Sequence, residues 1–323
     1  MSFKFSDVQE AYEKITPYIK QTPLEESFYL GDERQKYFFK LEIMQTVKSF
    51  KVRGAANKLL NLTDEEKARG ICAISSGNHG SAVSYLSSVL GIKNVTVIVP
   101  ETAPKSKIFK IQHFGATVLK MGKNPDEAEN LGNVYIKQNN LVKIDSYYDD
   151  ARIYAGQGTV AIEILRQNPE IDTIVVPAGG GSLITGCAVA AKGINPNVRV
   201  IGVQTENCPA LKKSIDENHF YEKYPCESSL CDALIGGIGK LCFELSPKYV
   251  DDVITVTEES IGKAISFMAR KEKYIIEAGS ATTVAAVMEH RKKIGGKNVA
   301  LIISGGNIDG DLLCKMMETY PDV

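Results

Sequence analysis

The segment TIVVPAGGGSLITGCAVAAK (residues 173–192) decides the fold class of this chain. Its β-branched start predicts a buried strand, its glycines a tight turn and its apolar remainder a helix, which together form a unit typical of α/β proteins. Pro177 and Gly179–Gly181 interrupt the uncharged stretch, so a membrane span fits it poorly. The N–H groups at such a helix start favour an anion such as phosphate. The alternative is a turn whose glycines only relieve steric crowding.

The same alternation of short strands and longer helices continues on both sides of this segment. Strands are predicted at 71–74, 95–99, 117–120, 173–176, 198–203, 253–256 and 299–303, and helices at 80–90, 104–114, 125–138, 151–167, 183–192, 258–271 and 280–293. This order predicts mostly parallel sheets covered by helices. No Pro/Ser-rich linker interrupts the chain, so any domain boundary is packed, and we expect boundaries near residues 60 and 148.

Composition narrows the class of partner. The 323 residues include 38 Lys and Arg against 39 Asp and Glu, a net charge of −1, so no overall basic field exists to attract nucleic acid or anionic lipid. We therefore expect no nucleic-acid or membrane partner. The amino terminus is too polar for a secretory signal. The 7 cysteines are an odd, scattered set, which favours reduced thiols in a cytoplasmic protein, and Cys226 and Cys231 are interpreted as ordinary thiols.

A second loop, SSGNHG (residues 75–80), also follows a predicted strand and begins a helix. Its hydroxyl, amide and N–H groups could hold a carboxylate at the helix N-terminus. The alternative is an ordinary capped helix start, in which Ser or Asn satisfies the unpaired N–H groups. His79 taken alone is more often a structural hydrogen-bonding residue than a base.

Two further segments carry side chains suited to chemistry. In SFKVRGA (residues 49–55), burial beside Phe50 would lower the pKa of Lys51 and free its amine to form a Schiff base. Composition leaves open that Lys51 lies on a solvated face, as most lysines do. In ISGGN (residues 303–307), Ser304 ends a strand, where its hydroxyl either meets a ligand or caps the turn.

In their order and spacing, these segments resemble the fold-type II pyridoxal-phosphate enzymes, and in particular the serine/threonine dehydratase and serine racemase group. The resemblance extends from about Lys14 to Asn307. It implies the tryptophan synthase beta-like fold, with two domains that each hold a central, mostly parallel sheet flanked by helices. Residues 1–60 and 149–323 would form the large cofactor-binding domain and 61–148 a small inserted domain. The residues after Asn307 are too few for a regulatory domain, so none is expected.

The resemblance also implies roles for single residues, with pyridoxal 5'-phosphate as the cofactor. Lys51 would form the Schiff base and act as base, and Ser76 matches a second acid/base of the racemases. The cofactor-binding set is Phe50, Lys51, Asn78, Gly179, Gly180, Gly181, Ser182, Leu183 and Ser304, and the substrate-binding set is Ser75, Ser76, Gly77, Asn78, His79 and Gly237. Asn78 would contact the ring hydroxyl and Ser304 the pyridine nitrogen. Gln204 and Ala210 stand where racemase-like members carry acidic metal ligands, so no metal is expected.

The implied activity is that of an L-threonine/L-serine dehydratase (ammonia-lyase), acting on a small amino acid as a homodimer or homotetramer in the cytoplasm. Serine racemisation, or dehydration of another β-hydroxy amino acid such as hydroxyaspartate, is the alternative, because Ser76 is compatible with both reactions. A cysteine-forming synthase fits less well, since such relatives differ around the lysine. From a different class, a non-catalytic anion-binding α/β protein would also account for the two glycine loops.

Overall fold

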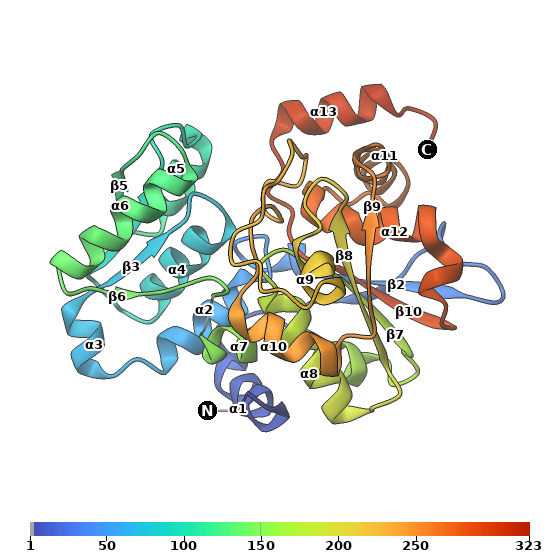
Figure 1. Cartoon of the computed structure of the whole chain (residues 1–323), viewed down its shortest axis with the longest axis horizontal. Coiled ribbons are helices and arrows are strands. Elements are labelled where there is room, and N and C mark those ends of the chain that lie inside the picture. Colours follow the sequence, from blue (N-terminus) through green and yellow to red (C-terminus); the bar gives the residue numbers. More distant parts are fainter. Residues whose placement is uncertain (1–2, 149) are drawn as a thin grey trace.

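The computed structural model describes residues 3–148 and 150–323. Figure 1 shows how the elements are arranged in space. Their bounds are α1 (Phe5–Ile15), η1 (Thr16–Tyr18), β1 (Leu24–Glu26), β2 (Lys36–Leu41), η2 (Glu42–Met44), α2 (Lys51–Leu60), α3 (Asp64–Arg69), β3 (Ile71–Ile74), α4 (Asn78–Val89), β4 (Val95–Val99), α5 (Lys105–His113), β5 (Thr117–Lys120), α6 (Pro125–Gln138), β6 (Val142–Lys143), α7 (Ala151–Gln167), β7 (Thr173–Pro177), α8 (Ser182–Ile194), β8 (Arg199–Thr205), α9 (Ala210–Asp216), α10 (Lys240–Tyr249), β9 (Asp252–Val256), α11 (Glu258–Phe267), η3 (Met268–Glu272), α12 (Ala278–Ile294), β10 (Asn298–Ile303) and α13 (Gly310–Thr319).

The larger sheet has six strands in the order β1-β2-β10-β7-β8-β9, and all pairs except β1 with β2 are parallel. Its interior strands are buried on both faces, which explains their nearly continuous apolar sequences. In β7, Ile174 and Val176 belong to one hydrophobic core, while Val175 belongs to the core on the opposite face. Helices α1, α7 and α8 cover the first face, and α11 and α12 cover the second (Figure 1).

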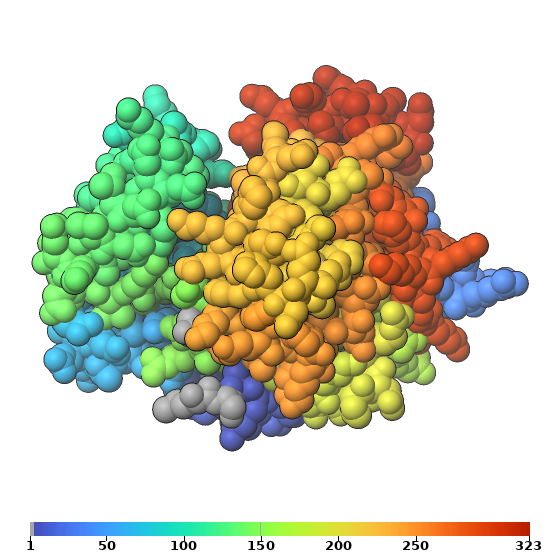
Figure 2. Space-filling view, viewed as in Figure 1, coloured from blue at the N-terminus to red at the C-terminus, as the bar shows by residue number. Residues whose placement is uncertain are grey.

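The smaller sheet has four parallel strands in the order β5-β4-β3-β6, all drawn from residues 71–143. Helix α2 packs against α4 beside it, and its apolar residues share the core of this sheet. Figure 2 shows a furrow between the green surface of this part and the yellow and orange surface of the larger part. The division into domains at residues 60 and 148 stays a prediction.

The elements expected from the sequence are confirmed as helices and strands, mostly to within two residues. The predicted helix at 258–271 ends earlier, because α11 stops at Phe267 and a π-helical segment, Met268–Glu272, follows it. Caps explain several starts: the Asn124 side chain accepts from the Glu127 N–H at the start of α6, and that of Asp150 accepts from the Arg152 N–H at the start of α7. Among the described residues, no helix is long and apolar enough to cross a membrane.

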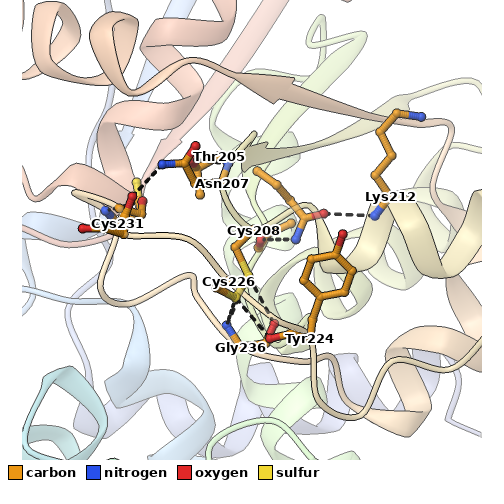
Figure 3. Close-up of a disulfide and its surroundings, with 12 residues drawn as sticks. Thr205, Asn207, Cys208, Lys212, Tyr224, Cys226, Cys231 and Gly236 are labelled. Atoms are coloured by element: carbon orange, nitrogen blue, oxygen red, sulfur yellow. Dashed lines mark hydrogen bonds between the residues drawn. A yellow bond between two sulfur atoms is a disulfide. The ribbon is translucent and has the colours of Figure 1, made fainter.

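The expectation of free thiols is wrong for two of the cysteines. Cys208 and Cys226 form a disulfide, with Cα atoms 4.8 Å apart (Figure 3). The loop after α9 folds back to the end of β8, and so brings together two cysteines that lie 18 positions apart in sequence. The Gly236 N–H points at both sulfur atoms, at 3.3 and 3.1 Å. Cys231, the nearest cysteine to Cys226 in sequence, is a buried free thiol.

Candidate active site

Lys51 and Ser304 lie together because the backbone before the lysine is joined to the turn after β10. The Phe50 N–H donates to the Ser304 carbonyl oxygen at 2.9 Å, and the Gly306 N–H donates to the Lys48 carbonyl oxygen at 2.9 Å. Lys51 is the first residue of α2. Strand β10 neighbours both β2 and β7, so the carboxyl ends of these parallel strands meet at one edge of the sheet, where α/β proteins bind ligands.

The environment of Lys51 favours its neutral amine. Burial lowers the pKa of Lys51 from 10.5 to about 8, although the charges of Asp145 and Glu277 act in the opposite direction. The Lys51 Nζ lies 5.2 Å from the centre of the Phe50 ring. A lysine with this pKa has a larger neutral fraction near physiological pH than an ordinary lysine, and the neutral amine is a nucleophile and a base.

The glycine loop 179–181 forms a cradle of backbone donors at the start of α8. The N–H groups of residues 179–183 donate to no acceptor within the described part of the chain, so they are available to an anion. Gly181 has φ +97°, and a Cβ there would lie 2.2 Å from the Cys242 Sγ. A Cβ on Gly180 would lie 2.3 Å from the Tyr147 ring. Steric crowding therefore requires glycine at both positions, while the N–H groups without an acceptor favour the anion-site interpretation over a simple turn.

Other members of the predicted cofactor set contribute differently. The Ser182 hydroxyl donates to the Ser146 carbonyl oxygen at 3.2 Å, so only its N–H belongs to the cradle. The Leu183 side chain packs in the core, and again only its N–H faces the loop. The Ser304 hydroxyl lies 3.0 Å from the Ser280 hydroxyl, which also bonds both the N–H and the carbonyl oxygen of Gly305.

The SSGNHG loop lies across from this edge at the start of α4. Ser75, Ser76, Gly77 and Asn78 are half-buried, whereas His79 is buried and its Nε2 bonds the Ile144 carbonyl oxygen at 2.8 Å. Burial lowers the pKa of His79 to about 4, so the imidazole is neutral and structural. Gly237 is buried against the Glu222 carbonyl oxygen, in the loop whose Gly239 N–H donates to the Gly180 carbonyl oxygen.

A buried ion cluster supports the lysine helix. The Arg53 guanidinium, two residues after Lys51, pairs with Glu42 and Glu163 at 2.8 Å, and Lys40 pairs with Glu163 at 2.6 Å. All four side chains are at most 2% exposed. Because the two positive and two negative charges balance, the cluster joins α2 to β2 and α7 without an unpaired buried charge.

No role was predicted from the sequence for Glu277 or for Asn307. Both lie beside Asn78, since the Asn78 Nδ2 donates to the Glu277 carboxylate and the Asn307 Nδ2 donates to the Asn78 Oδ1. The sequence feature that could have indicated Glu277 is a single carboxylate between the apolar Ile275-Ile276 and the small residues of 278–281. The Gln204 Nε2 donates to the Ala178 carbonyl oxygen, and the Lys212 N–H donates to the Gln204 Oε1.

The chain belongs to the family of pyridoxal-phosphate dependent enzymes, because the sequence profile described as "Pyridoxal-phosphate dependent enzyme" matches residues 15–305. It is 39% identical over 309 residues to "L-threonine dehydratase catabolic TdcB" of Staphylococcus aureus (strain USA300), covering 94% of this chain and 88% of that protein. It is 38% identical to "L-threonine ammonia-lyase" of Thermotoga maritima, covering 97% and 77%. The structure of maize serine racemase superposes with a TM-score of 0.91 at 31% identity, covering 99% and 98%.

The predicted fold class, family and cofactor are thereby confirmed, and the alternative of a non-catalytic anion-binding protein is set aside. The residues fit pyridoxal phosphate on structural grounds alone. The glycine cradle offers unpaired N–H groups to a phosphate, and the lowered pKa of Lys51 suits attack on an aldehyde. Ser304, which carries a neutral hydroxyl, follows β10, and its carbonyl oxygen accepts from the N–H of Phe50, the residue before the lysine.

The pH dependence of cofactor capture follows from the pKa of Lys51. Only the neutral amine attacks an aldehyde, so the rate at which cofactor-free protein takes up pyridoxal phosphate should rise with pH, with a midpoint near 8. Because this pKa lies below the ordinary 10.5, the unfolded chain binds the extra proton between those values, so stability from this group increases as pH rises through that window. Stopped-flow absorbance measures the capture rate; a midpoint near 10.5 would contradict the buried environment.

Proposed function

We propose that the protein is an L-threonine/L-serine ammonia-lyase that converts a β-hydroxy amino acid to a 2-oxo acid and ammonia. The observation that carries this proposal is the 38–39% identity, over almost the whole chain, to relatives named for L-threonine dehydration. The lowered pKa of Lys51 supports it, since the reaction needs a base at the α-carbon, and the glycine cradle supplies donors for a phosphate.

In this proposal the cofactor phosphate is held by the N–H groups of residues 179–183, its ring nitrogen by Ser304 and its ring oxygen by Asn78. When bound, pyridoxal phosphate supplies a conjugated ring that accepts the electron pair left at the α-carbon. Because Ser304 is a neutral hydroxyl rather than an acid, it leaves the ring nitrogen largely unprotonated, which favours elimination over transamination.

The substrate carboxylate is proposed to bind the SSGNHG loop. The N–H groups at the start of α4 and the hydroxyls of Ser75 and Ser76 supply donors there, and the helix N-terminus favours the negative charge. The Lys51 Nζ removes the α-proton, and the β-hydroxyl leaves from the neighbouring carbon. The α-proton and the hydroxyl are thus lost together as water, and hydrolysis of the remaining enamine gives the 2-oxo acid and ammonia.

The second candidate function is serine racemisation. It is favoured by the similarity to maize serine racemase and by Ser76, a half-buried hydroxyl in the proposed substrate loop that could return a proton to the opposite face. Hydroxyaspartate stays a candidate substrate, because nothing in these residues measures the β-substituent.

The test is a panel of L-threonine, L-serine and hydroxyaspartate, with 2-oxo acid release and D-serine formation measured side by side, with and without magnesium. We expect 2-oxo acid from L-threonine and L-serine to exceed D-serine, with no dependence on magnesium. D-serine forming faster than pyruvate would replace the lyase assignment with the racemase one. Ser76→Ala separates the two reactions, since it should remove D-serine formation while retaining elimination.

We also propose that the protein acts in the cytoplasm as a homodimer or homotetramer. The five free cysteines favour a reducing compartment, while the Cys208–Cys226 disulfide weighs against one. Phe28 is 93% exposed and Tyr29 57% exposed, as expected for residues covered by another copy. Light scattering on the purified enzyme measures the oligomer directly, and a monomeric mass would contradict this assignment.

A further inference from the structure

Four polar side chains form a continuous row between the parts of the molecule that hold the two sheets. Lys110 lies on α5, Asn307 after β10, Asn78 at the start of α4 and Glu277 just before α12. The Lys110 Nζ donates to the Asn307 Oδ1 at 2.6 Å, and the Asn307 Nδ2 donates to the Asn78 Oδ1 at 2.6 Å. The Asn78 Nδ2 then donates to the two Glu277 carboxylate oxygens at 2.9 and 3.0 Å. We call this row the Lys110–Glu277 chain.

The two end residues of the Lys110–Glu277 chain, Lys110 and Glu277, fix the direction of its hydrogen bonds. An ammonium group can only donate hydrogen bonds and a carboxylate can only accept them, whereas an amide does both and can be turned over. If the Asn78 amide were reversed, its NH₂ group would face the Asn307 NH₂ group and its oxygen would face the Glu277 carboxylate. Both contacts would be repulsive, so the ends permit one orientation of Asn78.

Asn307 is held independently of Asn78. Its Nδ2 also donates to the Val47 carbonyl oxygen at 2.9 Å, which the Lys110 Nζ approaches at 3.0 Å. The Asn307 backbone N–H donates to the Glu277 Oε2 at 3.2 Å. The Glu277 carboxylate therefore receives donors from Asn78 and from Asn307, and both of its oxygens are used.

The fixed orientation leaves one donor of Asn78 free. Both bonds to Glu277 go to a single carboxylate, so one N–H of the Asn78 NH₂ group serves them. The second N–H has no acceptor within the described ranges 3–148 and 150–323. A reversed amide would present its oxygen at this place. The Lys110–Glu277 chain therefore determines whether Asn78 presents a donor or an acceptor to the site.

We infer that Glu277, Asn307 and Lys110 are positioning residues that keep an N–H of Asn78 turned toward the ring oxygen of the bound cofactor. This inference rests on the proposed function, in which Asn78 meets that oxygen. An N–H donor stabilises the deprotonated ring oxygen, whereas a carbonyl oxygen in its place requires the ring oxygen to keep its proton. The two forms differ in colour, since the deprotonated form of the bound cofactor absorbs in the visible and the protonated form in the near ultraviolet.

The experiment records absorption spectra of the substrate-free, cofactor-loaded enzyme for Glu277→Gln and Glu277→Asp, and for Lys110→Met and Lys110→Arg. In Glu277→Gln the carboxamide has one acceptor for two donors, and Asn78 relieves the conflict by turning over. We expect the ratio of visible to near-ultraviolet absorbance to fall about tenfold, the scale of one charge-assisted hydrogen bond. Lys110→Met should lower it about twofold to threefold, because Val47 still holds Asn307.

The conservative variants test the polarity of the chain rather than its packing. Glu277→Asp keeps an acceptor-only end and Lys110→Arg a donor-only end, so both should keep the spectrum of the unchanged enzyme. Lys105→Met is the matched control, because Lys105 lies on the same helix and is exposed. An unchanged spectrum in Glu277→Gln, or equal shifts in Glu277→Gln and Glu277→Asp, would overturn the inference.

The same spectra separate this inference from the function beneath it. No substrate is present, so a failed dehydratase assay leaves the spectral result intact. If the unchanged enzyme lacks a visible band, the proposed cofactor site itself is wrong. If it has the band and Glu277→Gln and Lys110→Met both retain it fully, only the role of the Lys110–Glu277 chain is wrong. Cofactor content, measured after alkaline release, shows that each variant is loaded.

Discussion

Replacing Lys51 with alanine should lower the release of 2-oxo acid from L-threonine by at least about 10²–10⁴-fold, the usual contribution of one acid–base group. The larger end of this range is expected, because in the proposed site the same amine also links the cofactor to the protein. The visible absorption band of the purified protein should disappear with the activity. Coupled assay of the 2-oxo acid and an absorption spectrum measure the two effects on one sample.

Two further variants show whether the effect is specific to the amine of Lys51. Lys51→Arg keeps a positive charge but offers no amine to an aldehyde, so it should be as inactive as Lys51→Ala. Lys67→Ala removes a half-buried lysine of α3 and should leave rate and spectrum unchanged. If Lys51→Ala retained the visible band, another lysine would have to hold the cofactor, and the proposed site would be wrong.

Arg53→Met should have the largest effect on stability, lowering the free energy of unfolding by about 3–5 kcal/mol. The substitution leaves Glu42 and Glu163 buried with only Lys40 as a positive partner. The arginine bonds at 2.8 Å are lost, and one carboxylate charge becomes uncompensated. Urea unfolding of the cofactor-loaded enzyme, followed by circular dichroism, measures the change.

The matched control for Arg53→Met is Lys212→Met, which breaks an exposed ion pair with Asp216 and should cost no more than about 1 kcal/mol. A double variant, Arg53→Met with Glu42→Gln, removes one charge of each sign and should recover part of the loss. Equal losses in the single and double variants would show that packing, rather than charge balance, determines the contribution of Arg53.

Local sequence patterns predicted β7, β8 and β10 because these strands are apolar on both faces. These patterns failed for β2, whose sequence KYFFKL contains Lys36 and Lys40. Lys40 is buried in the ion cluster instead of being exposed, so the strand lacks a simple apolar pattern. They failed for α2 because Gly54 lowers helix propensity, although a Cβ there would lie 2.5 Å from the Gln157 Nε2, so close packing requires glycine. Tertiary contacts override propensity in both cases.

The residues of the candidate site were also predicted only in part. Lys51, the two glycine loops and Ser304 were predicted because each forms a compact motif. Glu277 and Lys110 were missed because each is a single charged residue, and only the fold brings them to Asn78. The cysteine pairing was misjudged for the same reason, since Cys226 lies nearer in sequence to Cys231 than to its partner Cys208.

The pairing of β2 with β10 also bears on how the enzyme is made. Leu41 lies opposite Ile303 in the parallel register, so a strand near the amino terminus has its neighbour near the carboxyl terminus. During synthesis, β2 and the lysine behind it must wait for almost the whole chain to leave the ribosome before they acquire this neighbour. A nascent chain stalled before residue 298 therefore lacks the backbone partners that hold Lys48 and Phe50 in place, and cofactor capture becomes a late event in the life of each molecule.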